Sequence, residues 1–157
     1  KYTQTDATFT GFDLDTQWDV IPQRFSHNLK LSYLRAYDRR EQGYLVFIPA
    51  NRIENELRWS VGKVFSSKDT YLMLSHLWVD KQRRVPPNSD FMEPPSAYHL
   101  WNINIGGMLS LKESSQLHWT FAVQNALNTS YRDYLNRFRY FATEQGRNVS
   151  LKLRYTF

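Results

Sequence analysis

Cysteine is absent from this sequence of 157 residues, and glycine and proline occur only six times each. The lack of cysteine excludes disulfide bridges and thiolate metal sites. Few glycines and no glycine-rich loop exclude a phosphate-binding loop of that kind. No apolar run reaches the roughly 18 residues of a transmembrane helix. The first thirty residues lack signal-peptide features, so we expect any leader to have been removed or to lie outside a fragment.

Aromatic side chains are abundant, with ten Tyr, ten Phe and five Trp. This composition favours strands over helices. The formal net charge of +5 suits an anionic partner such as a lipid headgroup or an acidic ligand. The basic residues stand mostly in pairs near turns, in YDRREQ and DKQRRVP. A nucleic-acid-binding surface has a continuous basic stripe with interleaved aromatics, so we expect no nucleic-acid partner.

Apolar and polar residues alternate along most of the chain, and no segment shows a helical period. In the last ten residues Val149, Leu151, Leu153, Tyr155 and Phe157 share one parity. Successive side chains of a strand point to opposite faces, so the pattern predicts one apolar and one polar face. Segment 70–79 is apolar on both parities, and its faces stay unassigned. The predicted strands are 7–20, 25–37, 52–62, 70–79, 100–111, 116–125 and 148–157.

Short connections alternate with long ones along the predicted strands. Connections 21–24, 65–69 and 112–115 are short, whereas 38–51, 81–97 and 134–146 are long. In an up-and-down antiparallel sheet all long loops then lie at one end, as in outer-membrane barrels. A ten-residue strand tilted near 45° rises about 23 Å, close to the apolar band of such barrels. Aromatics near strand ends suit interfacial girdles: Trp18, Tyr37, Trp78, Trp101 and Tyr155.

Two alternatives stay open, because alternation does not say whether the apolar face meets lipid or a core. One is a soluble antiparallel β-barrel that binds a small apolar ligand. The other is a small closed outer-membrane barrel with an adhesin or structural role, which needs an eighth strand. Segment 7–20 starts almost at the N-terminus, at the long-loop end. We therefore favour a C-terminal segment of a larger barrel.

Three segments together resemble the C-terminal part of the TonB-dependent outer-membrane receptors. FTGFDLDTQWDVIP resembles the family's Gly-aromatic-acidic-apolar-acidic strand and periplasmic turn, and IPANRIENELRW its Pro-x-x-Arg strand entry. WTFAVQNALNTSYRDY resembles the strand that ends in Asn-Leu-Phe and Tyr, although Ala126 separates Asn125 from Leu127. The chain ends on Phe157, as the family does, with Lys152 where the assembly signal usually has Gly. The assembly-signal residues are Leu151, Leu153, Tyr155 and Phe157.

The resemblance implies an all-β fold: about seven strands of an antiparallel, up-and-down transmembrane barrel of about 22 strands with a plugged lumen. It implies uptake of a scarce ligand (siderophore, haem, cobalamin, glycan or peptide) across the bacterial outer membrane, without enzymatic activity or cofactor. The implied partners are membrane lipid and lipopolysaccharide, the rest of the barrel with its plug, the TonB complex through a part outside this chain, and a surface lipoprotein.

Charged residues on the polar parity are predicted to face the lumen or plug, where charges stay hydrated or pair across strands. They are Asp13, Asp15, Lys30, Glu54, Glu56, Arg58, Lys152 and Arg154; a solvated ionic lattice is the alternative. The long loops are predicted to face the ligand, since arginine binds anions and aromatics stack on flat molecules. Lipopolysaccharide contact or loop solvation is the alternative there. The loop candidates are Arg39, Arg40, Arg83, Arg84, Phe91, Tyr134, Arg137, Arg139 and Tyr140.

No pattern in the sequence predicts catalysis or a metal site. His27, His76, His99 and His118 lie on separate predicted strands or loop edges without ligand spacing. The carboxylates have no nucleophile or base beside them. We therefore expect the histidines to be ordinary polar or wall residues.

Overall fold

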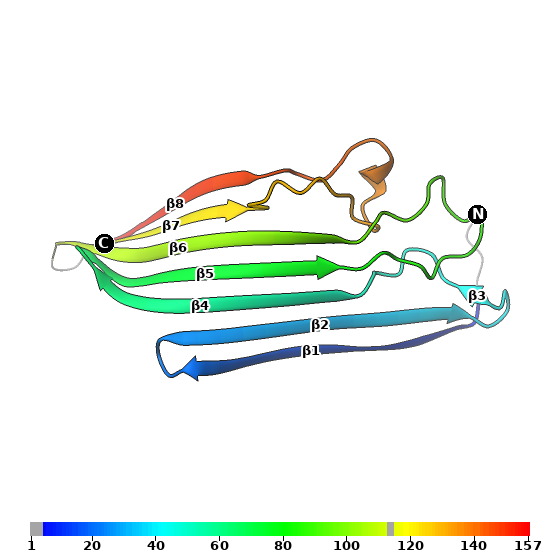
Figure 1. The fold of residues 1–157 in the computed structure, drawn as a ribbon, viewed down its shortest axis with the longest axis horizontal. Coiled ribbons are helices and arrows are strands. Elements are labelled where there is room, and N and C mark those ends of the chain that lie inside the picture. The colour runs from blue at the N-terminus through cyan, green and yellow to red at the C-terminus, as the bar shows by residue number, and fades with distance from the viewer. Residues whose placement is uncertain (1–4, 113–114) are drawn as a thin grey trace.

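A computed structural model describes residues 5–112 and 115–157, and in these residues eight strands form one antiparallel sheet. Figure 1 shows the long strands side by side in chain order. The short strand β3 (Gly43–Tyr44) pairs only with the end of β2. The prediction of an all-β, up-and-down antiparallel fold is confirmed. The long strands are β1 (Ala7–Ile21), β2 (Phe25–Asp38), β4 (Arg52–Val64), β5 (Ser67–Val79), β6 (Tyr98–Lys112), β7 (Ser115–Gln124) and β8 (Asn148–Thr156).

The sheet is open in the part of the chain that the structure describes. There, β1 pairs only with β2, and β8 pairs only with β7. Strand β3 does not close it, because it continues the pairing of β2 at Tyr37 and Asp38. It is therefore not the eighth wall strand that a small closed barrel needs.

The two ends of the sheet differ, as the connections predicted. Segments 22–24 and 65–66 turn at one end, and segments 39–51, 80–97 and 125–147 lie at the other (Figure 1). The predicted short connection 112–115 lies partly outside the described residues. The last long loop contains the 3₁₀ helix η1 (Arg137–Tyr140). No helix in the described residues has the length and apolar character needed to cross a membrane.

The first tight turn shows how the local sequence shapes the short-turn end. The Arg24 N–H donates to the Ile21 carbonyl over 3.0 Å. Pro22 has the fixed φ that suits the second position of the turn, and Gln23 at the third has a φ of 59°. This turn therefore holds a non-glycine residue in the left-handed region.

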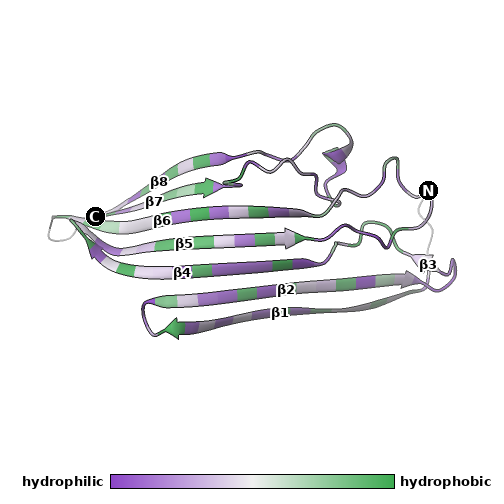
Figure 2. Ribbon diagram, in the orientation of Figure 1, coloured by the Kyte–Doolittle hydropathy of each residue, from purple (hydrophilic) through white to green (hydrophobic). Residues whose placement is uncertain are grey.

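The strand register places the alternating residues on two opposite faces of the sheet. Leu14 lies opposite Leu31, Leu31 opposite Ile53, and Phe121 opposite Leu151. We call this side the apolar face and the other side the polar face. The apolar face is open: Leu151 is 63% exposed. Figure 2 shows hydrophobic and hydrophilic residues interleaved along the strands.

The buried core lies on the polar face, near the long-loop end. It consists of Ala50, Val79, Tyr98 and Leu100, and Leu77 and Tyr131 pack against it. The register resolves the faces of segment 70–79. Leu77 and Val79 lie opposite Glu54 and Arg52, on the polar face, where Tyr131 from loop 125–147 contributes to their cover.

Candidate functional site

Two of the long loops are joined by a buried charged cluster that we call the loop clamp: Asp90, Tyr134, Arg139 and Tyr140. Arg139 is only 2% exposed. Its guanidinium donates to the Tyr134 carbonyl, to one carboxylate oxygen of Asp90, and to the Tyr140 hydroxyl over 2.9 Å. The Tyr140 hydroxyl donates to the other Asp90 oxygen. Loops 80–97 and 125–147 are therefore held together through one buried ion pair.

The hydrogen bonds in the clamp determine the protonation of its acid. Burial raises the pKa of Asp90, but hydrogen bonds from Tyr140 and Arg139, with the Arg139 charge, outweigh it and lower the pKa below its usual value. The hydrogen bond to Asp90, followed by burial, raises the pKa of Tyr140. The ionised acid and the neutral phenol are therefore both favoured near neutral pH.

A second set of contacts fixes loop 125–147 to the polar face of the sheet. Asp133 Oδ2 accepts from Arg52 Nη2 over 2.7 Å and from the Tyr98 hydroxyl over 2.8 Å. The Tyr131 ring packs on Tyr98 with 4.5 Å between ring centroids. At the loop's start, Asn125 bonds the backbone N–H and carbonyl of Thr129. The loop therefore lies inward on the polar face.

The first long loop is tied to the other two. The buried Gln82 side chain donates to the carbonyls of Ile48 and Pro49 over 2.8 and 3.1 Å. The Phe47 N–H donates to the Tyr134 hydroxyl over 3.4 Å. The three loops therefore form one connected structure at their end of the sheet.

An open hollow of about 500 Å³ lies between loops 80–97 and 125–147. Lys81 and Arg132 contribute positive charge to its lining, and Tyr98 and Tyr131 contribute aromatic rings; Arg139 also lines it but is paired with Asp90. Glu93 lies 3.3 Å from Lys81. Cationic and aromatic groups together suit a ligand that carries an anionic group and a flat or sugar-like part.

Of the predicted loop candidates, three belong to the clamp. Tyr134 and Arg139 are buried, and Tyr140 is half-buried. Phe91 is 94% exposed, and its ring meets the Tyr140 ring edge-on at 5.7 Å. Arg137 is exposed on η1.

The other predicted loop arginines have partners within the chain. Arg83 bonds both Asp80 oxygens over 2.9 Å. Arg84 donates to Asn51 over 3.1 Å. Arg39 donates to Thr8 over 2.7 Å, and Arg40 to Asp6 over 3.4 Å. Several residues of these contacts were not predicted from the sequence: Lys81, Asp90, Tyr98, Tyr131, Arg132 and Asp133. For Asp90 and Asp133, the only signal in the sequence was that they lie in loops that also contain arginines.

The predicted lumen-facing charges lie on the polar face, with acidic residues mostly on β1 and β4. Lys30 lies opposite Asp15 on one side and Glu54 on the other, and Asp13 and Glu56 share this face. A second hollow, of about 360 Å³, lies in the basic part of the face; Arg58, Asp69, Tyr71, His118, Lys152 and Arg154 help line it. The polar face is therefore acidic on one side and basic on the other.

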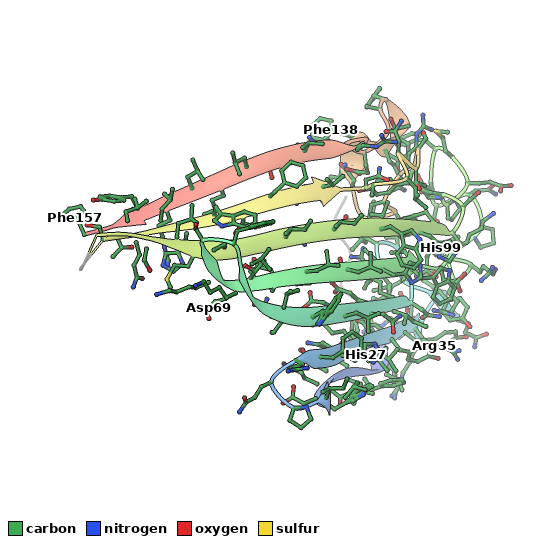
Figure 3. The ribbon with its side chains drawn as sticks, turned by 60° about the vertical axis from the view of Figure 1, so that its left-hand side comes forward. His27, Arg35, Asp69, His99, Phe138 and Phe157 are labelled. Carbon is green, nitrogen blue, oxygen red and sulfur yellow. The ribbon has the colours of Figure 1, made fainter. Side chains whose placement is uncertain are left out.

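The predicted assembly-signal residues lie along β8, which runs from loop 125–147 toward the short-turn end. Leu151, Leu153 and Tyr155 are exposed on the apolar face of β8. The Phe157 ring follows the strand, with its centroid 5.9 Å from that of Tyr155. Figure 3 shows Phe157 at the left-hand tip of the molecule, well away from Phe138 at its upper edge.

No family model matches this sequence, and no curated protein matches it. The fold is similar to that of a solved structure described as "Copper transporter OprC", with a TM-score of 0.78 and 16% identity. The match covers 96% of this chain and 24% of that one, so the chain spans about a quarter of that structure's length. At this identity the likeness establishes the fold alone. The fold is that of an open, antiparallel, up-and-down sheet consistent with a segment of a β-barrel wall.

Proposed function

We propose that this chain forms part of the wall and mouth of a TonB-dependent transporter in the bacterial outer membrane. The observation that carries the proposal is the division of one sheet into an exposed apolar face and a charged polar face that loop 125–147 covers only at the long-loop end. An outer-membrane barrel wall has this division, with lipid on one side and a hydrated lumen on the other.

The exposed apolar residues favour lipid over water as the medium outside the sheet. Phe12, Leu151 and Leu153 are each more than half exposed. Soluble monomers rarely expose an apolar patch larger than a few hundred Å². This supports a membrane wall over a soluble barrel. By analogy with outer-membrane barrels, the proposal places the long loops outside the cell and the short turns in the periplasm.

The hollow between the loops supports uptake of a ligand with an anionic group. Lys81 and Arg132 offer positive charge there, which suits an anionic chelate better than a bare metal cation. The proposed cargo classes are those that the resemblance implies, namely siderophore, haem, cobalamin, glycan or peptide, and the hollow favours members that carry an anionic group. A plug docks against the charged polar face, and the TonB complex and a surface lipoprotein act through parts outside this chain.

An uptake assay tests this function. Cells with the protein, without it, and without TonB are compared for uptake of a ferric siderophore, haem and cobalamin. We expect uptake of one of these to be lost in both deletions. Lys81→Ala with Arg132→Ala should reduce that uptake at least about tenfold, because two charge-assisted contacts are removed. Arg137→Ala is the matched control, an exposed loop arginine outside the lining.

Two results would count against the proposal. Uptake that needs this protein but not TonB would contradict the TonB dependence. Unchanged uptake of all three probes in the deletion strains would contradict the transport function for those ligand classes.

A further inference from the structure

The hollow of about 360 Å³ in the basic part of the polar face is here called the basic hollow. It shares no lining residue with the hollow between the long loops. It lies toward the short-turn end, since Asp69 follows the start of β5 by two residues and Arg154 precedes the end of β8 by two. Its titratable lining consists of Arg58, Asp69, Tyr71, His118, Lys152 and Arg154.

An aromatic ring forms a flat floor in the basic hollow. Tyr71 of β5 lies opposite Gly106 of β6, and both line the polar face. A Cβ atom at Gly106 would lie 2.7 Å from the Tyr71 hydroxyl oxygen and 2.8 Å from two of its ring carbons. Because glycine has no Cβ, the Tyr71 ring can lie directly over β6.

The Arg58 guanidinium lies over this ring, with its central carbon 3.8 Å from the ring centroid. Stacking on an aromatic ring uses the flat side of a guanidinium and leaves the N–H groups at its edge for an acceptor. Arg58 forms no ion pair within the described residues. The Tyr71 ring therefore holds Arg58 in a fixed place without neutralising its charge.

The three cations of the basic hollow lack an acid partner, in contrast to Lys30 in the acidic part of the same face. Lys30 lies opposite Asp15 on one side and Glu54 on the other. The residues directly opposite the three cations are Ser26 and Met73 for Arg58, Thr120 for Lys152 and His118 for Arg154. In the part of the chain that the structure describes, none of these cations forms an ion pair, and neither does Asp69. Ion pairs within the wall therefore do not account for this group of charges.

The charge and the size of the basic hollow indicate the kind of ligand. Three cations and one carboxylate leave a net charge of +2 when His118 is neutral. Like charges gathered in one hollow repel one another unless an anion lies between them. Sites for small molecules have volumes of about 300–1,000 Å³, so the hollow has room for a small molecule rather than for one carboxylate alone.

We propose that the basic hollow binds a small polyanion, a molecule with at least two carboxylate or phosphate groups. Arg58 binds one anionic group through the edge of its guanidinium, and Lys152 and Arg154 bind another. The hollow lies nearer the periplasm than the loop hollow does, so it gives an anionic cargo a second place to bind on its way inward. This role in transport rests on the proposed function, whereas the binding itself does not.

Isothermal titration calorimetry of the full protein in mild detergent tests the site. The protein carries Lys81→Ala and Arg132→Ala, so that these two cations of the loop hollow do not contribute. The probes are citrate and pyrophosphate, with several anionic groups, and acetate, with one. We expect one citrate or one pyrophosphate to bind per protein, and acetate not to bind at the same concentrations. Adding Arg58→Gln with Arg154→Gln should weaken binding at least about tenfold, because two charge-assisted contacts are lost.

Tyr71→Leu distinguishes a built site from general positive charge. It keeps every charge and removes the ring that supports Arg58, so citrate affinity should fall about threefold or more. Lys30→Gln is the matched control, because it removes a cation of the same face outside the lining and should leave the affinity unchanged. The shift in gel mobility on boiling verifies folding of every variant.

Several results would overturn the proposal. Equal citrate affinity with and without Arg58→Gln and Arg154→Gln would place the binding elsewhere, and unchanged affinity in Tyr71→Leu would mean that charge alone attracts the anion. Acetate binding as tight as that of citrate would contradict the polyanion. Absence of citrate binding, with a lower unfolding temperature in the variant without Arg58 and Arg154, would mean that an acidic side chain of the plug fills the hollow. Binding is measured without uptake, so failure of either test leaves the other unaffected.

Discussion

Arg139 is a charged side chain that solvent barely reaches, and its environment explains why it is tolerated. Asp90 supplies the opposite charge, and Tyr134 and Tyr140 supply further oxygen partners. Removing one partner of a buried ion pair typically costs about 3–5 kcal/mol, because the remaining charge is uncompensated. The joining of the two loops therefore depends on one carboxylate.

The clamp should open in acid. The folded-state pKa of Asp90 lies below its ordinary value, so its stabilising contribution is present above about pH 4 and is lost as pH falls through the folded pKa. Hydrogen exchange of loops 80–97 and 125–147 measures this. We expect amide protection in both loops, corrected for intrinsic exchange rates, to fall together in that range.

Asp90→Asn should lower protection in both loops already at pH 7 and remove the acid transition. Glu93→Gln is the matched control, since that acid lies in the same loop, and its exposed pair with Lys81 contributes at most about 1 kcal/mol. If the loss of protection in acid persists in Asp90→Asn, the titrating group is not Asp90.

At the scale of the strand, neighbouring residues of β8 lie on opposite faces of the sheet. Leu151 lies on the apolar face opposite Phe121, and Lys152 lies on the polar face opposite Thr120. In the proposed membrane orientation Leu151→Arg places a charge against hydrocarbon and should destabilise the folded protein by about 2–4 kcal/mol. Lys152→Gln should change the free energy of unfolding by less than about 1 kcal/mol. Urea unfolding in lipid vesicles compares them, and equal effects would mean that the faces do not meet different media.

The alternation of apolar and polar residues predicted the long strands because every second residue of a strand lies on the same face of the sheet and meets the same surroundings. It failed for the faces of segment 70–79, where Leu77 and Val79 are apolar residues on the polar face. These two residues are apolar because Tyr131, from a loop that starts more than forty residues later in the chain, helps to cover them. Strand β3 was missed because its length of two residues is too short to alternate.

The functional site was less predictable than the sheet. The loops and their arginines were recognisable, but the pairing of Arg139 with Asp90 joins residues from different loops. The contact between histidines was also not predictable, because the sequence pattern places them on separate strands or loop edges. His76 and His99 meet because the register of β5 on β6 makes them diagonal neighbours on one face, and no local pattern gives that register.

At the scale of the whole molecule, the exposed apolar face should make the protein inseparable from lipid or detergent. The natively expressed protein should stay with membranes after an alkaline carbonate wash and shift its gel mobility on boiling. A β-barrel in lipid keeps its backbone hydrogen bonds satisfied internally and so resists detergent until heated. A protein that leaves the membrane fraction and does not shift would show that the apolar face is covered by protein.

The order of the long strands also bears on how quickly the sheet forms. Every long strand pairs with the next long strand in the chain. The entropy lost in closing a loop grows only with the logarithm of its length, about 0.6 kcal/mol per doubling. Each new strand can therefore pair with the one before it, and no pairing joins distant parts of the chain. We expect the slowest step to be the pairing of β7 with β8, because it closes the longest loop, 125–147.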